Sequence, residues 1–281
     1  MSLYPLPEVA VEEESRLVGL ARQGDKAALQ ALVEPWRRPL FGYIYRMVTQ
    51  PQDAEDLLQD VLVRVIEGLA QYRGQGRFKS WLFGIATHVC LDHLRRKKRW
   101  SADAQLQAER RAEASQDEIE QIGALLAAPD FLFEIREHVA FCFACIGRTL
   151  PPDQQAALLL REVLGFSAEE AAALMNVSEP VFRHRLAAAR ASMIDSFEGL
   201  CQLINKTGVC YQCKGLRDFA PQAHRGAELV RIQVAPGVNV TPESLFEARL
   251  DIVRRADLEN GTSRSLHDRF FRDLTSQQEG S

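Results

Sequence analysis

The chain has 281 residues, of which 46% are hydrophobic, and a formal net charge of −4 at pH 7. Such a length has room for about two globular domains, and the acidic balance argues against indiscriminate binding of nucleic acid over the whole surface. No apolar run is long enough to span a bilayer, and the N-terminal tail, residues 1–14, ends in three glutamates and lacks the basic start of a signal peptide. We therefore expect a cytoplasmic protein without membrane insertion.

Residues 15–100 have the apolar periodicity of helices. Large apolar side chains recur every three or four positions after Asp25, which can cap a helix, and again in a stretch that begins near Pro51. Glycines around Gly74 break the pattern before a third helix, expected over residues 78–99. Together these helices predict a compact helical domain.

The remainder of the chain divides into a linker, a second helical domain and a tail. Residues 101–130 are acidic and poor in large apolar groups, which is typical of a linker. A second helical domain is expected over residues 131–197. The tail, residues 198–281, holds a candidate strand at 229–234 and a helix expected from Thr241 to about Ala256. The predicted fold class is all-α, with two helical domains and a small mixed C-terminal extension.

The second domain ends in a helix-turn-helix pattern. Ser167 and Glu170 can form a capping box before a short helix, and Asn176 tolerates the left-handed conformation of a tight turn. Ser178 can then cap a second helix that accepts Pro180 in its first turn. In such a motif the second helix enters the major groove of DNA. A solvated amphipathic helix with scattered arginines is the alternative.

The outward face of this second helix combines small, polar and cationic side chains, whereas Phe182 and Met193 fall on the inward face. Recognition of DNA needs this combination, because base edges and phosphates are contacted side by side. The residues assigned to this interface are Ser178, Glu179, Pro180, Val181, Arg183, His184, Arg185 and Arg190.

Three motifs of the first domain occur in a characteristic order: Asp53-Ala-Glu-Asp-Leu-Leu-Gln-Asp, then Tyr72-Arg-Gly-Gln-Gly-Arg-Phe-Lys-Ser-Trp-Leu, then Leu91-Asp-His-Leu-Arg-Arg-Lys-Lys-Arg. They resemble region 2 of bacterial sigma factors, and residues 150–190 resemble region 4. The short linker is similar to that of the extracytoplasmic-function (ECF) group. The resemblance covers about residues 15–197 and implies that the protein binds core RNA polymerase and helps open promoters, with region 4 at the −35 element and region 2 at the −10 element.

An acidic, amide-bearing face of the second helix is assigned to the polymerase. Complementary charge sets the register and the rate of such docking, and the resemblance implies a basic coiled coil of the β′ subunit as partner, within a complex that also includes the β subunit. A solvated helix face is the alternative. The residues of this face are Asp53, Glu55, Asp56, Gln59 and Asp60.

The loop over residues 71–79 mixes aromatic and cationic side chains, which is the chemistry that binds single-stranded DNA. By resemblance it would capture a flipped base of the non-template strand without ATP. Phe78 and Trp81 are alternatively core residues, and Tyr72 fits either role. An exposed edge of the third helix and the basic run behind it complete the interface. The assigned residues are Tyr72, Arg73, Arg77, Lys79, Thr87, His88, Asp92, Arg95, Arg96 and Lys97.

The exact −10 sequence stays open, because the family often has Arg-Asn where this chain has Thr87-His88. The basic run from Arg95 to Arg99 is expected to grip phosphate, and each neutralised phosphate steepens the salt dependence of binding.

Two C-x-x-C pairs, Cys142 with Cys145 and Cys210 with Cys213, could supply four thiolates to one tetrahedral zinc. The first pair is alternatively core packing, since free cysteine behaves as a small buried hydrophobe. The second pair favours metal ligation or redox chemistry. If both pairs joined, the tail would be pinned against region 4. Zinc is therefore a candidate structural or sensory ion, and no other cofactor is expected.

Two other functional classes compete with a sigma factor. A free-standing helix-turn-helix regulator would bind duplex DNA alone, usually as a dimer, and would not need the first domain's acidic face. A thiol oxidoreductase built on C-x-x-C is disfavoured, because the expected βαβ surroundings are missing. No catalytic residue is assigned and no enzyme is predicted. An anti-sigma factor, or inhibition by the tail in cis, is a further hypothesis.

Overall fold

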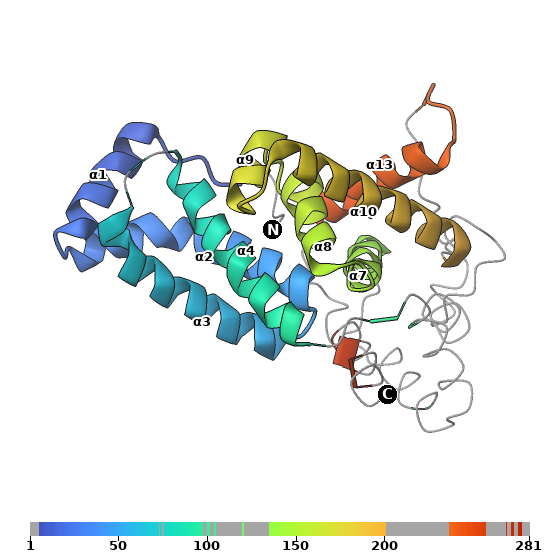
Figure 1. Cartoon of the computed structure of the whole chain (residues 1–281), viewed down its shortest axis with the longest axis horizontal. Helices are drawn as coiled ribbons and strands as arrows, with labels where there is room; N and C mark the ends of the chain where they lie inside the picture. Colours follow the sequence, from blue (N-terminus) through green and yellow to red (C-terminus); the bar gives the residue numbers. More distant parts are fainter. Residues whose placement is uncertain are drawn as a thin grey trace. The chain divides into compact units, whose positions relative to one another are not determined.

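The computed structural model describes residues 6–72, 74, 76–97, 100–101, 104, 120, 135–200, 236–256, 268, 271–272 and 275–276 (Figure 1). Throughout this part of the chain the regular elements are helices and no strand occurs, as predicted for an all-α protein. The chain folds into two compact units. The N-terminal unit combines Ser2–Lys97 with Pro152–Ala187, and the C-terminal unit combines Lys98–Pro151 with Ala188–Ser281.

The N-terminal unit begins with four helices and one short 3-10 turn: α1 (Val11–Arg22), α2 (Lys26–Val48), α3 (Pro51–Gly68), η1 (Leu69–Gln71) and α4 (Phe78–Arg96). The predicted cap of α2 is confirmed, because the Asp25 carboxylate accepts hydrogen bonds from the backbone N–H groups of Ala27 and Ala28 at 2.9 and 3.1 Å. Gly74 and Gly76 adopt φ values of +70° and +106°, which end the helical run before α4.

Three further elements and half of a fourth complete this unit: α8 (Pro152–Leu158), a π-helical turn η2 (Leu159–Val163), α9 (Ala168–Leu174) and the first half of α10 (Glu179–Leu200). Gly165, with a φ of +75°, has the left-handed conformation that commonly ends a helical segment. Helices α8 and α9 both pack against α4. The contacts therefore group α8 and α9 with the helices of residues 6–97, and the domain boundaries expected at 100 and 131 stay predictions.

The C-terminal unit is built from α7 (Ile135–Gly147), the second half of α10 and α13 (Pro242–Arg255). Each of these three helices contributes one phenylalanine, and the three rings pack against one another. The ring centroids of Phe143 and Phe197 lie 6.3 Å apart, those of Phe143 and Phe246 lie 6.1 Å apart, and those of Phe197 and Phe246 lie 6.4 Å apart. The tail helix expected to begin at Thr241 is confirmed, with a Thr241–Ser244 capping box. Helix α13 is thus part of a hydrophobic core.

Several expectations fall outside the residues that the structure describes. They include most of the linker over 101–130, the candidate strand over 229–234, and the second C-x-x-C pair. Among the helices that can be described, none combines the length and the apolar character that a membrane crossing requires.

The burial of α13 leads to a stability prediction. Phe246 is only 2% exposed, so replacing it with alanine should remove its contacts with α7 and α10 and leave a cavity. We expect Phe246→Ala to lower the free energy of unfolding by about 3–5 kcal/mol, measured by chemical denaturation. Val238→Ala is the matched control, because Val238 is 51% exposed just before the same helix. Equal stabilities of the two variants would contradict the packing of α13.

Candidate nucleic-acid interface

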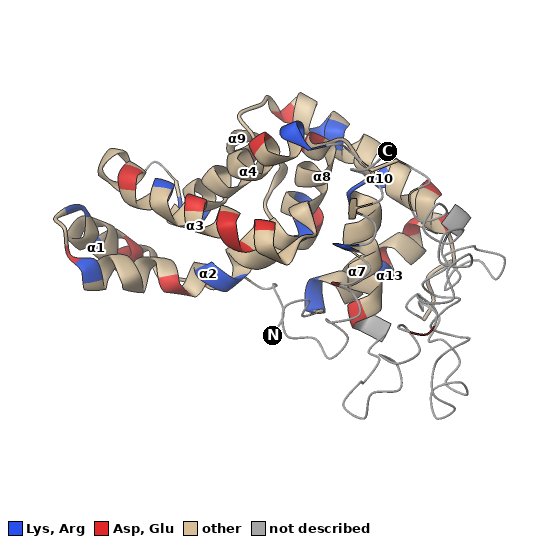
Figure 2. Cartoon of the chain, turned by 90° about the horizontal axis from the view of Figure 1, so that it is seen from below, with Lys and Arg blue, Asp and Glu red and all other residues tan. Residues whose placement is uncertain are grey.

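Helix α3 separates apolar from acidic side chains. Its buried stripe consists of Ala54, Leu57, Leu58, Val61 and Val65. Figure 2 shows acidic residues on the ribbon of α3. Four of the polar residues assigned to polymerase docking are exposed on this helix: Glu55, Asp56, Gln59 and Asp60. We call these four residues the acidic face of α3. Their exposure leaves the carboxylates hydrated and available to a cationic partner.

Asp53 has a different environment from the acidic face. Its carboxylate lies 3.2 Å from Nε2 of His93 and 3.9 Å from Nζ of Lys97, both at the C-terminal end of α4, and its side chain is 30% exposed. Asp53 therefore connects α3 to α4. No sequence pattern indicates this contact, because the partners lie about forty positions away along the chain.

The aromatic residues around the glycine loop form a cluster. The Tyr72 ring lies 5.8 Å from that of Phe78 and 4.9 Å from that of Trp81, and the Tyr72 hydroxyl donates to the carbonyl of Gly76 at 2.8 Å. Tyr72 is only 8% exposed, and burial raises the pKa of its hydroxyl. Phe78 is fully buried, with its N–H donating to Glu14 at 2.9 Å. Phe78 is therefore a core residue, which was the alternative to a role in binding single-stranded DNA.

The cations assigned to the same loop already have protein partners. Arg77 donates from Nη2 to the carbonyl of Val9 at 2.7 Å and lies 3.7 Å from the Glu14 carboxylate. The ammonium of Lys79 lies 4.8 Å from the ring centroid of Phe166, a cation–π geometry. Arg73 lies outside the described residues.

The expectation that Thr87 lies on an exposed edge of the third helix is wrong. Thr87 is 0% exposed, and its hydroxyl donates to the carbonyl of Phe83 at 2.7 Å. Because that single proton is used, Tyr43 must donate the hydrogen bond that joins the two hydroxyls at 3.0 Å. Burial raises the pKa of Tyr43 well above its ordinary value, so this hydroxyl stays protonated. The Thr87 side chain is therefore in the core, where its hydroxyl is tolerated because it both donates and accepts a hydrogen bond.

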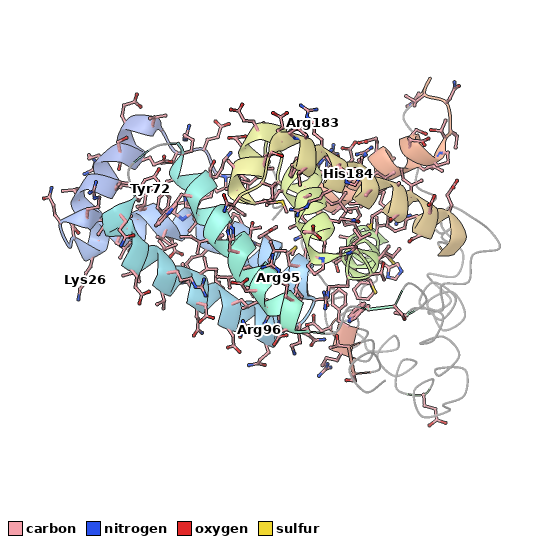
Figure 3. All side chains as sticks on the ribbon, in the orientation of Figure 1. Lys26, Tyr72, Arg95, Arg96, Arg183 and His184 are labelled. Carbon is pink, nitrogen blue, oxygen red and sulfur yellow. The ribbon has the colours of Figure 1, made fainter. Side chains whose placement is uncertain are left out.

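The other assigned residues of α4 do face solvent. His88 is exposed and its Nδ1 lies 2.8 Å from the carbonyl of Gly84. Asp92 accepts from Arg95 at 3.0 Å through its carboxylate and from Arg96 at 3.1 Å through its backbone carbonyl. Figure 3 labels Arg95 and Arg96 on this part of α4. Both arginines are therefore exposed cations at the end of the helix, where positive charge also complements the helix dipole.

The helix-turn-helix has the local structure that the sequence predicts. Ser167 and Glu170 form the capping box, with both hydrogen bonds present at 3.1 and 2.9 Å. Asn176 adopts the left-handed conformation, with φ +53°. Phe182 and Met193 are fully buried on the inward face of α10. The capping hydrogen bonds, the left-handed Asn176 and the buried face of α10 thus all support the predicted turn between α9 and α10.

Several of the DNA-contacting residues assigned to the start of α10 are exposed. Ser178, Pro180 and His184 are exposed, and Val181 is 43% exposed. They leave an outward face of small and polar groups at the N-terminal end of α10, where Figure 3 labels Arg183 and His184.

Each arginine of this helix forms an ion pair. Arg183 pairs with Glu179 one turn earlier at 2.5 Å, and Arg185 lies 2.9 Å from Asp153 of α8. Arg190, in the C-terminal unit, lies 2.5 Å from Glu247 of α13, and its guanidinium is 5.0 Å from the centroid of the Phe246 ring. The sequence did not reveal the partner of Arg190, since Glu247 comes from a tail helix with no apparent link to the motif.

The structure gives no support to a zinc site. Cys142 and Cys145 are buried in α7, with the Cys142 sulfur 3.5 Å from Nε2 of His138. Cys210 and Cys213 lie outside the described residues. Over the part of the chain that can be described, no three His, Cys, Asp or Glu side chains gather as a metal site.

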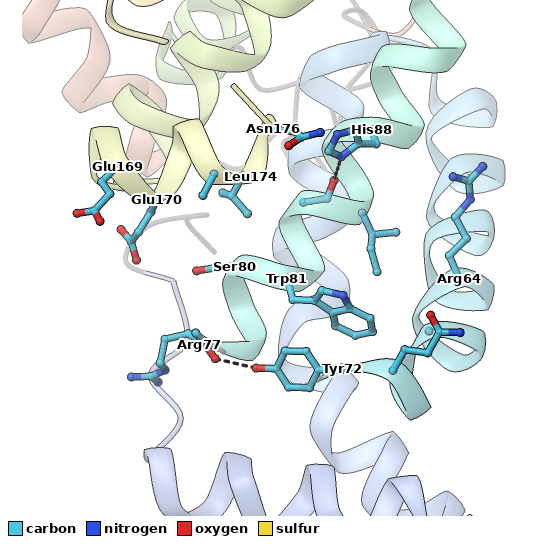
Figure 4. Close-up of a pocket in the computed structure, with 16 residues that line it drawn as sticks. Arg64, Tyr72, Arg77, Ser80, Trp81, His88, Glu169, Glu170, Leu174 and Asn176 are labelled. Carbon is cyan, nitrogen blue, oxygen red and sulfur yellow. Dashed lines mark hydrogen bonds between the residues drawn. The ribbon is translucent and has the colours of Figure 1, made fainter. Parts of the chain in front are cut away.

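A cavity of about 1,100 Å³ in the N-terminal unit lies between α4 and α9 (Figure 4). Trp81 and His88 line it from α4, Arg77 lines it from the preceding loop, and Asn176 lines it from the turn after α9. Residues assigned to the −10 interface therefore share one cavity with α9 and the turn of the helix-turn-helix, a relation that neither motif predicts by itself.

Fold and site together define an all-helical protein with a helix-turn-helix and a separate acidic helix face. Residues 32–100 match the family described as Sigma-70 region 2, and residues 142–193 match Sigma-70, region 4. These two segments of the chain are therefore similar to the sigma-70 family.

Named relatives agree with this assignment. The ECF RNA polymerase sigma factor SigG of Mycobacterium tuberculosis is 32% identical over 195 residues, a match that covers 66% of this chain and 52% of that protein. The chain thus spans about half the length of this relative. The RNA polymerase sigma-H factor of Pseudomonas aeruginosa is 28% identical over 67% of this chain and 96% of that protein. The solved structure of CnrH in complex with the cytosolic domain of CnrY is 20% identical, covering 64% of this chain and 94% of that chain with a TM-score of 0.45.

The burial of Thr87 can be tested against a role in contacting bases. We expect Thr87→Val to lower the free energy of unfolding by about 1–3 kcal/mol, because the Tyr43 hydroxyl is left buried without its acceptor. Thr87→Ser, which keeps the hydroxyl, should recover most of this loss. Chemical denaturation measures both variants, and a Thr87→Val protein of unchanged stability would contradict the structural role.

Proposed function

We propose that the protein is a sigma factor, which binds core RNA polymerase, directs it to promoters and assists their opening. The observation that carries the proposal is the coexistence of two surfaces in one chain. One is the exposed acidic face of α3, and the other is the helix-turn-helix of α9 and α10. A sigma factor uses both surfaces. The matches of residues 32–100 and 142–193 to Sigma-70 regions 2 and 4 support the same function.

Polymerase docking is proposed for the acidic face of α3. Its carboxylates are exposed, so they attract a cationic partner over a distance and need little desolvation until contact is made. Complementary charge of this kind fixes the register of docking and raises the association rate. A basic coiled coil of the β′ subunit is the proposed partner, and the polymerase β subunit belongs to the same complex.

Recognition of the −35 element is proposed for the first half of α10. Val181 and His184 are exposed and would meet base edges, and Arg183 is paired beside them with Glu179. Side chains that contact base edges recognise the DNA sequence, and neighbouring cations that contact phosphates fix the position of the helix on the DNA. The first half of α10 carries both kinds of group.

Binding of the −10 element is proposed for the exposed parts of α4 and its preceding loop. His88 is available to a base, and Arg95 and Arg96 are available to phosphates. Trp81 is partly exposed and lines the cavity, so it is the aromatic ring of this cluster best placed to meet a nucleobase.

The alternative is a regulator that binds duplex DNA by itself. Such a protein has no use for the acidic face of α3, because acidic side chains repel the phosphate backbone. The two functions differ in one requirement: a sigma factor needs the multisubunit polymerase to act, and a free-standing regulator binds its DNA site without it.

Transcription in vitro tests the proposed function. We expect the full chain to direct core RNA polymerase to specific start sites on genomic DNA of its source, detected by sequencing RNA 5′ ends. The double variant Asp56→Asn with Asp60→Asn should weaken binding to core polymerase roughly tenfold or more, because close charge pairs at such interfaces are worth about 1.5 kcal/mol or more.

Its matched control is Glu34→Gln, which removes a carboxylate elsewhere on the helical bundle. Specific start sites that do not depend on the added chain would reject the proposal. Equal polymerase affinity of the double variant and the control would reject α3 as the docking surface.

The ion pair of Arg190 leads to a separate prediction for the −35 interface. Glu247 competes with phosphate for the Arg190 guanidinium, so Glu247→Gln should strengthen binding of the holoenzyme to promoter DNA. Since Glu247 is half exposed, the expected gain is roughly 0.3–1 kcal/mol, or about twofold to fivefold. Glu243→Gln on the same helix is the control. Weaker or unchanged binding by Glu247→Gln in a promoter-affinity titration would contradict a DNA role for Arg190.

A further inference from the structure

A glutamate of helix α1 is buried beside the loop that precedes α4. Glu14 lies in the first turn of α1, and yet it is only 6% exposed. Its Oε1 atom accepts the N–H of Phe78 at 2.9 Å, and its Oε2 atom lies 3.7 Å from Nε of Arg77. Charged side chains are almost never buried unless they are paired, so these two contacts explain how Glu14 is accommodated.

The first contact caps α4 from outside the helix. The first N–H groups of a helix have no intrahelical partner, and Arg77, at the N-cap position, makes no capping hydrogen bond through its side chain. Glu14 comes from sixty-four positions earlier and supplies an acceptor for Phe78, the first residue of α4. A carboxylate at this end also complements the helix dipole. Glu14 therefore stabilises the start of α4.

The second contact restrains Arg77, a cation assigned to DNA. Besides lying near the Glu14 carboxylate, the guanidinium donates from Nη2 to the carbonyl of Val9 at 2.7 Å. Both partners belong to the chain at the start of α1. The Arg77 side chain is still 45% exposed, so a phosphate can approach the guanidinium while α1 holds it in place.

Helix α1 also contacts the other end of the same loop. Arg22, the last residue of α1, donates from Nη2 to the carbonyl of Ala70 in η1 at 3.3 Å. Within the loop, the Tyr72 hydroxyl donates to the carbonyl of Gly76 (Figure 4). Burial, and after it the negative charge of Glu14, raises the pKa of this hydroxyl. Helix α1 thus supports the loop at both of its ends.

The first turn of α4 carries the aromatic ring proposed to meet a nucleobase. The Trp81 ring lies 5.6 Å from that of Phe78, and the Trp81 N–H donates to the carbonyl of Arg77 at 3.3 Å. A displacement of this turn therefore moves Arg77 and Trp81 together. Groups that bind a ligand must be held to within about 0.5 Å by the residues that support them.

We propose that Glu14 is a positioning residue for the loop over residues 71–79, holding Arg77 and the start of α4 in the arrangement that recognises the separated strand of the −10 element. The proposal rests on the proposed function. Because Glu14 is buried, it acts through these neighbours and does not touch DNA itself. Helix α1 ends before residue 32, where the match to Sigma-70 region 2 begins, so that match assigns Glu14 no role.

Base discrimination by the polymerase holoenzyme tests this role. The probes are single-stranded oligonucleotides that carry the non-template −10 element of a promoter found by 5′-end mapping, in its native form and with single base substitutions. The discrimination ratio is the affinity for the native strand divided by that for a substituted one.

We expect Glu14→Gln, which keeps the size of the side chain and removes its charge, to lower the largest of these ratios by about threefold to tenfold. Glu13→Gln is the matched control, because Glu13 is an exposed carboxylate of the same turn that pairs with Arg16. Its ratios should equal those of the unaltered chain.

The ratio separates positioning from stability. Partial unfolding lowers the active fraction and scales binding to every oligonucleotide equally, whereas a displaced base-binding ring changes native and substituted strands by different factors. Ratios for Glu14→Gln as high as those for Glu13→Gln would overturn the positioning role and leave the sigma function intact. If the unaltered chain directs no specific transcription with core polymerase, the proposed function fails and the positioning role with it.

A double-mutant cycle tests whether Glu14 acts through Arg77. In the unaltered chain, Glu14→Gln should weaken binding of the native oligonucleotide by about twofold or more. In an Arg77→Ala background the same change should have little further effect, because the charge that it leaves unpaired has already been removed. Equal factors in the two backgrounds would mean that the residues act independently, and this result would overturn the proposal.

Discussion

The burial of α4 on several sides is the constraint on which the N-terminal unit depends. This helix packs against α2, α3, α8 and α9, and about half of its residues are buried. Even its one buried hydroxyl, that of Thr87, is used twice. What remains for function is a narrow strip that includes His88, Arg95 and Arg96. Because the same helix is the partner of α9, changes in its packing connect the two parts of the proposed promoter interface.

Local features were predictable from the sequence because their causes are local. The cap at Asp25, the capping box at Ser167 and the left-handed Asn176 each depend on residues within a few positions. The start of the tail helix at Thr241 follows from the same chemistry. The acidic face of α3 was also predictable, because helical periodicity alone separates it from the apolar stripe.

Contacts between distant segments were not predictable in the same way. Helical periodicity places Thr87 on the same face as the buried Phe83 and Leu94, but it does not identify the Tyr43 hydroxyl of another helix as its hydrogen-bond partner. Likewise, the amide of Gln155 and the carboxylate of Glu247 are ordinary polar groups until the fold brings them to α2 and α10. Periodicity reports which face of a helix is apolar, and it does not report which partner covers that face.

The C-terminal unit changes how the tail is understood. Helix α13 shares an aromatic core with α7 and the second half of α10, and Arg249 lies 3.7 Å from the ring centroid of Phe197. The segment matched to Sigma-70, region 4 ends at residue 193, before this helix begins. A part of the chain beyond the family match thus completes the packing around α10 and, through Glu247, forms an ion pair with Arg190, a residue proposed to contact DNA.

The most direct test of the central claim is equilibrium binding of the full chain to core RNA polymerase at several salt concentrations. The account predicts a specific complex whose affinity falls as ionic strength rises, since charge complementarity at α3 contributes to docking. Absence of a complex at any salt concentration, together with strong binding of duplex DNA by the chain alone, would contradict it.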